Sequence, residues 1–540
     1  MALVWSGTWG GIADSKWSGI AGSFYRAVGI DGISTPGLLK VRQKLKIIST
    51  GPSASVSPSA SASGSPSASV SPSASQSRSP SASASGSPSA SASPSASASP
   101  SASVSPSASV SPSTAAAADV DEFIKVAVNA SNGFSFWFSE DSGKIWAVDS
   151  DDNVTLAYTT TPAAGGAGCL GALEYNGYIY WATQSRLHRI AIANAVANWT
   201  AGINPNWATF GVTDASFHPM AIQQSATGPE LFVGDGNQVA GVDANGTFRD
   251  NLLDINTPLR IKSMAPYELD VLIGTYVADT VNQTELLRWD TVSTAWNFSD
   301  PIEEEGINAF LVDDNYLYVN AGRSGNWYFF NGERLEPFTR VPGDYSDTAY
   351  GLVHPNAVGN LNGLPVFGFS NGSGDPALEG VYVMGSYSRS YSKVMDLSFP
   401  ISTNVTSGVE IGAIITRGFD MYVSWKEGSN YGIDKIDYSN KYGSAYIETR
   451  MLGQNRRHKV KTLGDVGVLY NSLPASTGFT ISYSNNGAVY EAMTDITDSE
   501  INEVRAENSL GGVGSLQVKV GFDVSSNSAP TMEALDVVLQ

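Results

Sequence analysis

A tract that cannot pack divides this chain of 540 residues into two unequal parts. From Gly51 to about Ser113 the sequence consists almost wholly of Ser, Ala, Pro, Gly and Val, in repeats such as PSASVSPSASASGSPSAS. Such a segment buries too little apolar surface to offset its ordering entropy, so we expect no folded core in it. The foldable parts are therefore a head of about 50 residues and a body that begins near Ala118.

We expect the tract to act as a tether. Its spaced prolines favour extended polyproline II stretches of about 3.1 Å per residue, whereas its Ser and Gly segments contract toward coil dimensions. For roughly 60 residues the end-to-end span then lies between about 45 and about 190 Å. The head and the body are thus expected to be mechanically decoupled, as a spacer requires.

The body is predicted to be all-β. Short apolar runs rich in Tyr, Val, Ile and Trp recur between Gly, Asn and Asp turns, and no amphipathic helix pattern interrupts them. A unit of apolar strand, tight polar turn and second strand occurs seven times, at intervals of roughly 40 to 55 residues. The seven units are KIWAVDSDDNVTLAY, YIYWATQSRLHRIAI, ELFVGDGNQVAGVD, DVLIGTYVADTVNQTELLRWD, YLYVNAGRSGNWYFFNG, PVFGFSNGSGDPALEGVYVMG and DMYVSWKEGSNYGIDKID.

This repeat predicts a seven-bladed β-propeller over residues 119–452, because a closed ring of four-stranded blades leaves only short edges exposed. We expect Asp121–Asn129 to close the ring as an extra strand on the last blade. Residues 453–540 alternate with period two and predict a small C-terminal β-sandwich, with a hairpin turn at Asn486 and Gly487. The domain plan is completed by an N-terminal anchor over residues 1–50 and a disordered linker over residues 51–118.

The distribution of charge separates the head from the body. The whole chain has a formal net charge of −20, which disfavours nucleic acid as a partner because an acidic field repels phosphates. The head is basic instead, and this asymmetry suits docking on an acidic partner, with a solvated basic tail as the alternative. Its basic residues are Lys16, Arg26, Lys40, Arg42, Lys44 and Lys46, against Asp14 and Asp31.

Two further features bear on the compartment. Cys169 is the single cysteine, which excludes an intrachain disulfide framework. The sequence has no run of 18 apolar residues and no segment typical of a signal peptide, so we predict neither membrane insertion nor ordinary secretion. An aromatic, Gly-rich body without an export signal suits a particle that is assembled inside a cell and released by lysis.

One motif in the body resembles the Asp-box of sialidases and other propellers. SEDSGKIW, from Ser139 to Trp146, has the form S-x-D-x-G-x-x-W. The resemblance implies a turn device, in which Ser139 and Asp141 bond the turn backbone, Gly143 adopts a positive φ and Trp146 packs between blades. It supports a fold and not a catalytic site.

The sequence predicts no catalytic constellation, no resident cofactor and no metal centre, so we expect a protein that is not an enzyme. The four histidines form no metal-binding spacing, and no nucleophile or nucleotide motif stands in a suitable context. Acidic turns such as Asp149–Asn153 offer calcium-type ligands, but none keeps EF-hand spacing, so solvated turns are the preferred interpretation. Sugar stacking is the alternative use of the aromatic residues, and the candidates are Trp199, Trp207, Trp289 and Trp327.

The head also resembles N-terminal segments of tailed-phage virion proteins. Residues 15–45 contain the pattern D-G-x-S-x-P-G-x-x-K-x-R, and a Gly-rich segment followed by Pro-Gly and basic residues opens tail-nozzle proteins of short-tailed phages. The resemblance implies docking on the particle, and it places that role on Lys16, Arg26, Pro36, Gly37, Lys40, Arg42 and Lys44. The tether departs from the nozzle pattern, because a rigid tube wall has no evident use for it.

The expected function is therefore that of a structural or attachment protein in the tail or neck region of a virion, made in the host cytoplasm. Its expected partners are other virion proteins bound through the head, a host-surface glycan or receptor, and copies of itself in a symmetric ring. The alternative is a secreted or cell-surface propeller adhesin or lectin on a Ser/Pro stalk.

Overall fold

The computed structural model describes the residues that form sheets and most of their turns. The described ranges are residues 3–5, 24–35, 37–51, 120–159, 168–199, 201–212, 216–277, 281–313, 316–341, 345, 350–371, 379–385, 394–401, 408–452, 461–485, 487–493, 495–497, 503–513 and 515–539. These ranges contain strands and one 3₁₀ turn, η1 (Ile192–Asn194), but no α-helix. The all-β prediction is confirmed.

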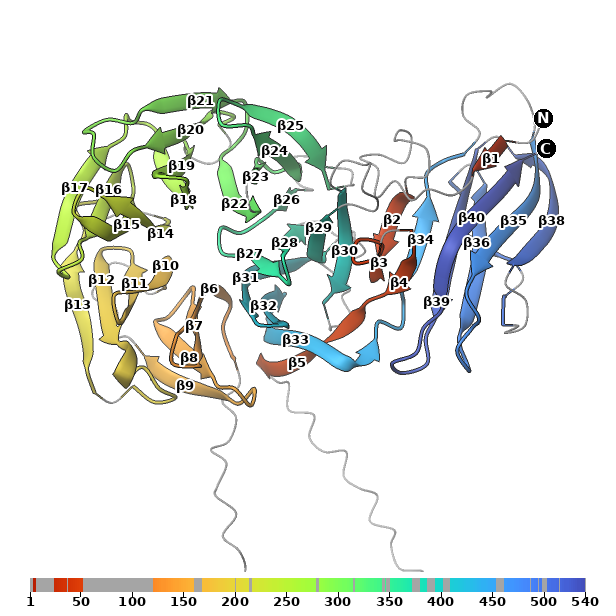
Figure 1. Cartoon of the computed structure of the whole chain (residues 1–540), viewed down its shortest axis with the longest axis horizontal. Helices are drawn as coiled ribbons and strands as arrows, with labels where there is room; N and C mark the ends of the chain where they lie inside the picture. The colour runs from red at the N-terminus through yellow and green to blue at the C-terminus, as the bar shows by residue number, and fades with distance from the viewer. Residues whose placement is uncertain are drawn as a thin grey trace, which may run out of the picture. The chain divides into compact units, whose positions relative to one another are not determined.

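Five antiparallel sheets are each built from four consecutive strands (Figure 1). The first two comprise β6 (Ile124–Asn129), β7 (Ser135–Ser139), β8 (Lys144–Val148) and β9 (Val154–Thr159), then β10 (Gly171–Tyr175), β11 (Tyr178–Thr183), β12 (Arg186–Ala191) and β13 (Ile203–Thr209). The third and fourth comprise β14 (Met220–Ser225), β15 (Gly228–Asp235), β16 (Gln238–Val242) and β17 (Phe248–Asp254), then β18 (Arg260–Tyr267), β19 (Asp270–Tyr276), β20 (Thr284–Trp289) and β21 (Phe298–Ile302). The fifth comprises β22 (Ile307–Asp313), β23 (Tyr316–Ala321), β24 (Asn326–Phe330) and β25 (Leu335–Arg340).

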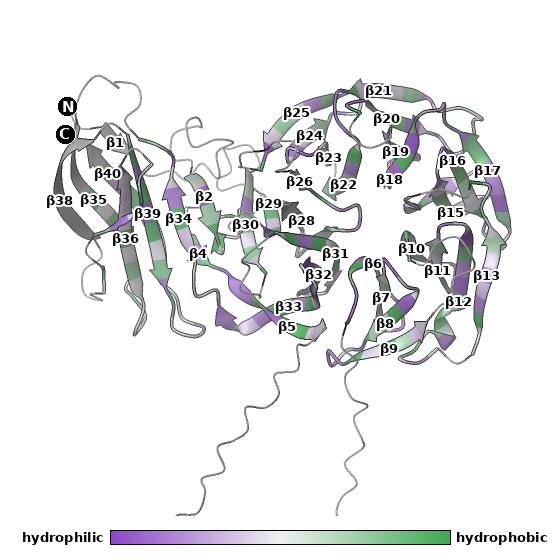
Figure 2. Ribbon diagram, turned by 180° about the vertical axis from the view of Figure 1, so that it is seen from behind, coloured by the Kyte–Doolittle hydropathy of each residue, from purple (hydrophilic) through white to green (hydrophobic). Residues whose placement is uncertain are grey.

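The second strand of each sheet is the most deeply buried. All five residues of β7 are buried, and in β19 every residue after Asp270 is buried. Such strands read as continuous apolar runs, because both of their faces are covered. The fourth strands are more polar and more exposed, as in β13 and β21. Figure 2 shows hydrophobic residues recurring along the strands all around this arrangement.

Neighbouring sheets contact one another through their innermost strands, and these contacts close into a ring. β6 touches β10, and contacts continue through β14, β18, β22 and β27 (Val358–Leu361) to β31, which touches β6 again. This cyclic order of radially stacked sheets is the arrangement of a β-propeller.

The sheet that precedes β6 in this ring receives its outermost strand from the head. It consists of β31 (Val409–Arg417), β32 (Asp420–Glu427), β33 (Asn430–Lys441) and β5 (Gln43–Gly51). Leu45 lies opposite Ile436, and Thr50 lies opposite Gly432. The expected closing strand, Asp121–Asn129, instead begins the next sheet as β6, so that prediction is wrong. The sequence did not predict β5 as a strand, because its lysines belong to the basic segment that we interpreted as a docking head, with a solvated tail as the alternative.

The two ends of the Ser/Ala/Pro tract meet on this closing strand. The Val120 N–H donates a hydrogen bond of 3.0 Å to the Ser49 hydroxyl, and Gly51 lies against the Val120 backbone, where a Cβ would not fit. Residues 52–119 lie outside the described residues, yet the chain leaves and re-enters the ring at neighbouring points. The tract therefore does not separate residues 24–51 from the body, and the decoupled head that we expected is wrong for those residues.

A longer sheet runs from the ring into the C-terminal region by way of the head. Its ring strands are β26 (Gly351–Leu352), β27 (Val358–Leu361), β28 (Leu364–Asn371), β29 (Gly380–Gly385) and β30 (Val394–Pro400). β2 (Phe24–Val28) pairs with β30 on one side and β34 on the other. The sheet then continues through β34 (Tyr446–Thr449), β39 (Leu516–Asp523), β36 (Gly478–Asn485) and β37 (Glu491–Ala492).

A second C-terminal sheet also incorporates head strands. It is formed by β1 (Leu3–Trp5), β3 (Ile30–Asp31), β4 (Leu39–Val41), β40 (Thr531–Leu539), β35 (Lys461–Tyr470) and β38 (Glu503–Val513). Tyr470 of this sheet packs on Phe479 of the longer sheet, with ring centroids 5.6 Å apart. Asn486 of the expected hairpin turn lies outside the described residues, and Gly487 has a φ of 80°.

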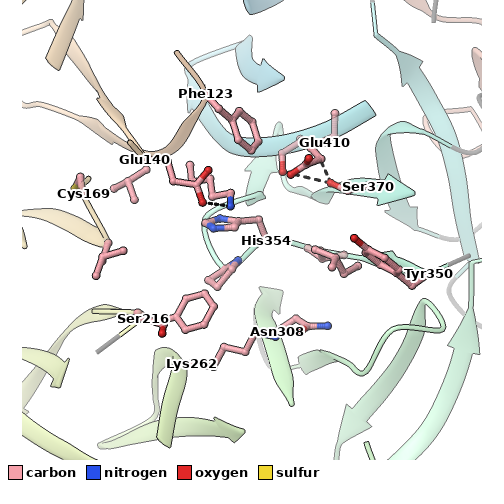
Figure 3. A pocket seen from close by; sticks show the side chains of 18 of the residues that line it. Phe123, Glu140, Cys169, Ser216, Lys262, Asn308, Tyr350, His354, Ser370 and Glu410 are labelled. Carbon is pink, nitrogen blue, oxygen red and sulfur yellow. Dashed lines mark hydrogen bonds and ion pairs between the residues drawn. The ribbon is translucent and has the colours of Figure 1, made fainter. Parts of the chain in front are cut away.

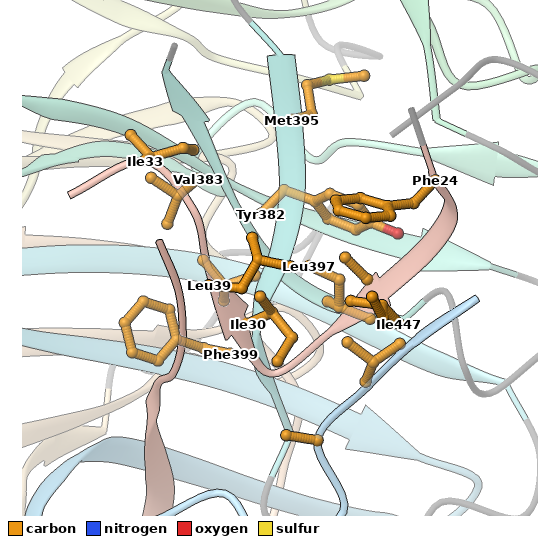
Figure 4. Close-up of a cluster of buried hydrophobic side chains, with 14 of the residues drawn as sticks. Phe24, Ile30, Ile33, Leu39, Tyr382, Val383, Met395, Leu397, Phe399 and Ile447 are labelled. Carbon is orange, nitrogen blue, oxygen red and sulfur yellow. The ribbon is translucent and has the colours of Figure 1, made fainter. Parts of the chain in front are cut away.

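One hydrophobic cluster joins the head, the ring and the C-terminal sheets (Figure 4). Phe24, Ile30 and Leu39 of the head are fully buried in it. They pack among ring residues such as Tyr382 and Leu397. Burying each large apolar side chain contributes about 1.5–3 kcal/mol, so this short segment adds substantially to the stability of the fold.

His188 shows how polar groups are accommodated within a sheet. Its Nδ1 accepts the Asn206 N–H at 2.9 Å, its Nε2 lies 3.0 Å from the Thr183 hydroxyl, and its ring stacks on Trp181. Burial, together with the nearby charge of Arg186, lowers the pKa of His188 to about 4 from the ordinary 6.5. A proton on Nδ1 would break the bond to Asn206, so the folded chain requires a neutral imidazole.

The ring closure predicts that the head stays bound after the tract is cut. A recognition site for a site-specific protease inserted in the tract beside Arg78 allows one cleavage there. We expect the N-terminal fragment to co-elute with the rest of the chain in gel filtration, and to separate from it only in denaturant. Release of the fragment under native conditions would contradict the pairing of β5 with β33.

The neutral state of His188 predicts a loss of stability in acid. The unfolded chain binds this proton near pH 6.5 and the folded chain only near pH 4, so the free energy of unfolding falls as the pH is lowered between these values. The full effect is roughly 3 kcal/mol. Urea unfolding at a series of pH values measures it, and His188→Gln should show a shallower decline than the wild type. Parallel curves for the two proteins would refute the assignment.

Candidate functional site

The innermost strands of the ring surround a cavity of about 530 Å³ (Figure 3). Its lining is drawn from several sheets, with Lys125 on β6, Lys262 on β18, Asn308 on β22, Ser370 on β28 and Ile411 on β31. The volume lies within the range of small-molecule sites, and polar groups from different strands converge on it. It is the candidate site.

One wall of the cavity is formed around Phe123, which directly precedes β6. The Lys125 ammonium lies 5.4 Å from the centroid of the Phe123 ring, and Lys426 lies 5.5 Å from it. Lys125 is ion-paired with Glu140, and Lys426 is paired with Glu410 at 3.4 Å. Each cation on this wall thus has a carboxylate partner.

The opposite wall is held by an amide network. The Lys262 ammonium donates a hydrogen bond of 2.6 Å to Asn308 Oδ1, and it lies 5.7 Å from the centroid of the Phe217 ring. Asn308 Nδ2 donates in turn to Asn320 Oδ1 at 2.9 Å and to the Gly322 carbonyl at 2.7 Å. Because the amide of Asn308 is fixed from behind, the position of the Lys262 head group is fixed as well.

His354 lies near the centre of the view in Figure 3. Burial and the charges of Lys125 and Lys262 hold the pKa of His354 well below its ordinary value. Its Nδ1 accepts the Asn356 N–H at 3.3 Å, and its ring is also hydrogen-bonded to the Gly412 backbone. Nδ1 is therefore engaged as an acceptor, and the imidazole is a neutral element of the cavity wall.

Two further polar groups of the lining, the Ser370 hydroxyl and the Cys169 thiol, contact backbone groups of the chain. The Ser370 hydroxyl accepts the Ile411 N–H at 2.8 Å. The Cys169 thiol faces the Gly171 carbonyl at 3.3 Å, and burial raises its pKa to about 12. A thiol in this state carries almost no thiolate at neutral pH, so Cys169 is not a nucleophile here.

The residues of the Asp-box lie outside the cavity wall except for Glu140, which stands inside the motif. The buried Ser139 hydroxyl accepts the N–H groups of Asp141 and Ser142 at 3.0 and 3.1 Å. Gly143 has a φ of 73°, and Trp146 is buried in the core. The motif shapes the turn between β7 and β8 and thereby places Glu140 at the cavity.

The tryptophans expected to stack on sugars do not line the cavity. Trp199, Trp289 and Trp327 are at most 3% exposed, and each packs on other aromatic rings. Trp207 is half-buried, with the Arg189 guanidinium 4.2 Å from its ring centroid. The prediction of stacking at the three buried positions is wrong, because these rings fill the spaces between sheets.

The expected docking residues of the head are largely paired within the chain. Arg42 is ion-paired with Asp31 at 3.0 Å, Lys44 with Asp437 at 3.9 Å, and Arg26 with Glu448 at 3.9 Å. The Lys40 ammonium donates to the Thr35 hydroxyl at 3.0 Å. Gly37 has a φ of 91° in the turn between β3 and β4, and Lys16 and Pro36 lie outside the described residues.

The contacts within residues 31–42 account for the D-G-x-S-x-P-G-x-x-K-x-R pattern through the folding of this segment itself. Asp31 Oδ1 accepts the N–H groups of Ile33 and Ser34, so it caps the turn that follows it. Arg42, the last residue of the pattern, returns to pair with that same carboxylate. In the folded chain the pattern therefore builds a hairpin.

The acidic turns bind their own backbone. Asp149 Oδ1 accepts the N–H groups of Asp151 and Asn153, and Asp243 accepts those of Asn245 and Thr247. Within the described ranges no group of three or more His, Cys, Asp or Glu residues is placed to hold a metal ion. The same ranges contain no helix of the length and apolarity needed to cross a membrane.

Comparison with known proteins yields fold-level likenesses only. No family model and no curated protein matches the chain. A streptogramin B lyase structure aligns with 59% of this chain and 94% of its own, at 10% identity and a TM-score of 0.38. The WD40 propeller domain of Doa1 aligns with 58% of this chain and 93% of its own (13% identity, TM-score 0.37). An exo-β-1,3-galactanase from Phanerochaete chrysosporium aligns with 76% of this chain and 94% of its own, at 9% identity and a TM-score of 0.28.

Sequence reasoning missed the residues that line the cavity. Lys125, Lys262, Asn308 and Glu410 are separated by tens of residues and belong to no motif. Their shared signal is position, since each lies near the start of the first strand of its sheet. That signal becomes visible only when the repeats are aligned by their first strands.

The environment of Cys169 predicts a masked thiol. The measurement is the reaction of Cys169 with a disulfide reagent at pH 8, where a pKa of about 12 in place of 9.0 leaves roughly a thousandfold less thiolate than in an unhindered cysteine. We expect no measurable reaction in the native protein and complete reaction of the one thiol in guanidinium chloride. Rapid native labelling would show that the cavity wall opens around Cys169.

Proposed function

We propose that this chain is a non-enzymatic structural and attachment protein of a tailed-phage particle. The observation that carries the proposal is the resemblance of residues 15–45 to N-terminal segments of phage virion proteins. The contacts of Asp31 and Arg42 support a structural purpose for that segment, because they fold it into the hairpin that joins the ring to the C-terminal sheets.

The same proposal includes the finer architecture. We take the ring to be a seven-bladed propeller and residues 453–540, with strands of the head, to be a β-sandwich. The cyclic contacts of the seven innermost strands support the first assignment. The packing of Tyr470 on Phe479 between two sheets supports the second.

The proposal that the chain is not an enzyme is supported by the bonds that the cavity side chains already make within the chain. The Nδ1 atom of His354 accepts the Asn356 N–H, and the Cys169 thiol is held protonated. Lys125 and Glu140 neutralise each other. A general base or nucleophile needs an available lone pair within reach of a substrate, and these groups do not offer one in this arrangement.

In this proposal the surface that docks on the particle is no longer the set of basic head residues. Arg26, Arg42 and Lys44 serve intramolecular pairs, so an acidic virion partner would have to meet other residues. We place neighbouring virion proteins and further copies of this chain around the C-terminal sheets or the outer ring strands. A location in the tail or neck region follows from the resemblance alone.

The second candidate function is a secreted or cell-surface lectin. The cavity favours it, because a closed ring with a polar interior is suited to holding a small ligand. The two functions differ in location: the first predicts the chain in released particles, and the second predicts it on or outside the producing cell.

The test is to follow the chain through purification of particles. Lysates of the producing cells are separated on a density gradient and probed with an antibody raised against the recombinant chain. We expect the chain to band with intact particles at a constant ratio to the capsid protein. Recovery only in the soluble or envelope fractions would overturn the virion proposal, and an envelope location would favour the lectin.

A further inference from the structure

The cavity combines charge balance with many hydrogen-bonding groups. The charged side chains among its described lining residues are Lys125, Lys262, Glu140 and Glu410, which sum to zero. Glu410 is also paired at 3.4 Å with Lys426, which is not itself one of the lining residues. A ligand with a full charge would lose its hydration on entering without meeting a net opposite charge.

The hydrogen-bonding capacity of the walls is nevertheless large. The Glu140 and Glu410 carboxylates each have one oxygen in an ion pair, and a carboxylate can accept several bonds. The ammonium of Lys262, which donates to Asn308, adds a positively charged donor to the same space. Acceptors and donors thus face the same space from different strands (Figure 3).

Partly exposed aromatic rings supply the apolar part of the lining. Phe217 and Tyr350 are half-buried and face the cavity. Tyr350 is held in place by the Arg323 guanidinium, which lies 5.0 Å from its ring centroid, and Arg323 is itself paired with Glu305 at 2.7 Å. Rings fixed in this way present flat apolar surface to C–H groups.

We propose that the central cavity binds a neutral saccharide, with ligand hydroxyls bonded to Glu410 and Lys262 and ring C–H groups packed against Tyr350 and Phe217. A pyranose matches this lining because it carries vicinal hydroxyls that both donate and accept, an apolar face and no net charge. The inference rests on the proposed attachment function, since it names the class of surface molecule that the ring would recognise. It moves the glycan site from the buried tryptophans to the ring interior.

The test uses the full-length chain and sugars that differ only in charge. Glucose, glucuronic acid and glucosamine share one ring and are neutral, anionic and cationic, and a panel of galactose, mannose, N-acetylglucosamine and their disaccharides covers stereochemistry. Saturation-transfer NMR detects binding, and calorimetry gives the affinity. We expect at least one neutral sugar to bind and its charged counterparts to bind about tenfold more weakly or not at all.

Two cavity variants and one control locate the binding. Glu410→Gln and Lys262→Met should each weaken binding of the neutral sugar by about tenfold or more, because each loses a charge-assisted bond. Arg334→Gln, which removes an exposed pair between the turn before β25 and Glu336, should leave it unchanged. Thermal unfolding of each variant checks that the ring remains folded.

The outcomes separate this inference from the function on which it rests. No binding by any neutral sugar, tighter binding of the charged analogues, or wild-type affinity in both cavity variants would overturn the saccharide site. If particles still contain the chain, the virion proposal survives that result. Sugar binding by a chain that is absent from particles would instead support the lectin and overturn the virion proposal.

Discussion

The pairing of β5 with β33 is the interaction on which the rest of the fold depends. It completes the sheet that stands between the last and first parts of the ring, and it fixes the start of β6 through the bond between Ser49 and Val120. A sheet that lacked this strand would expose a row of unpaired backbone groups. The same head segment then continues into the C-terminal sheets, so one stretch of about 28 residues connects every region of the described fold.

The interior of the ring illustrates how an acidic protein manages polar groups away from water. The net charge of the chain is −20, yet the charged residues that line the cavity are two lysines and two glutamates. Lys125 is ion-paired with Glu140, and Lys262 is hydrogen-bonded to the Asn308 amide. Neutral His354 fits this pattern, since two lysines near it disfavour a third positive charge.

The all-β class and the strand pairs of the repeats could be predicted because buried strands keep continuous apolar runs, as in β7 and β19. Outer strands such as β13 and β21 could not, because their polar, half-exposed residues resemble loops. β5 is the extreme case: its partner lies almost 400 residues away, and no local pattern encodes that distance. The cavity residues could not be predicted for a related reason. Lys125, Asn308 and Glu410 line one cavity only because the ring brings their strands together.

The adjacency of Gly51 and Val120 has a consequence for how this chain can evolve. Repetitive coding sequence readily gains and loses units during replication, and in most folds such changes would shift one element against another. Here the residues that flank the Ser/Ala/Pro tract, Gly51 and Val120, lie side by side. The number of repeats in the tract can therefore change without altering the spacing of any strand. Tract length is therefore a trait open to selection on its own, independent of the architecture that carries it.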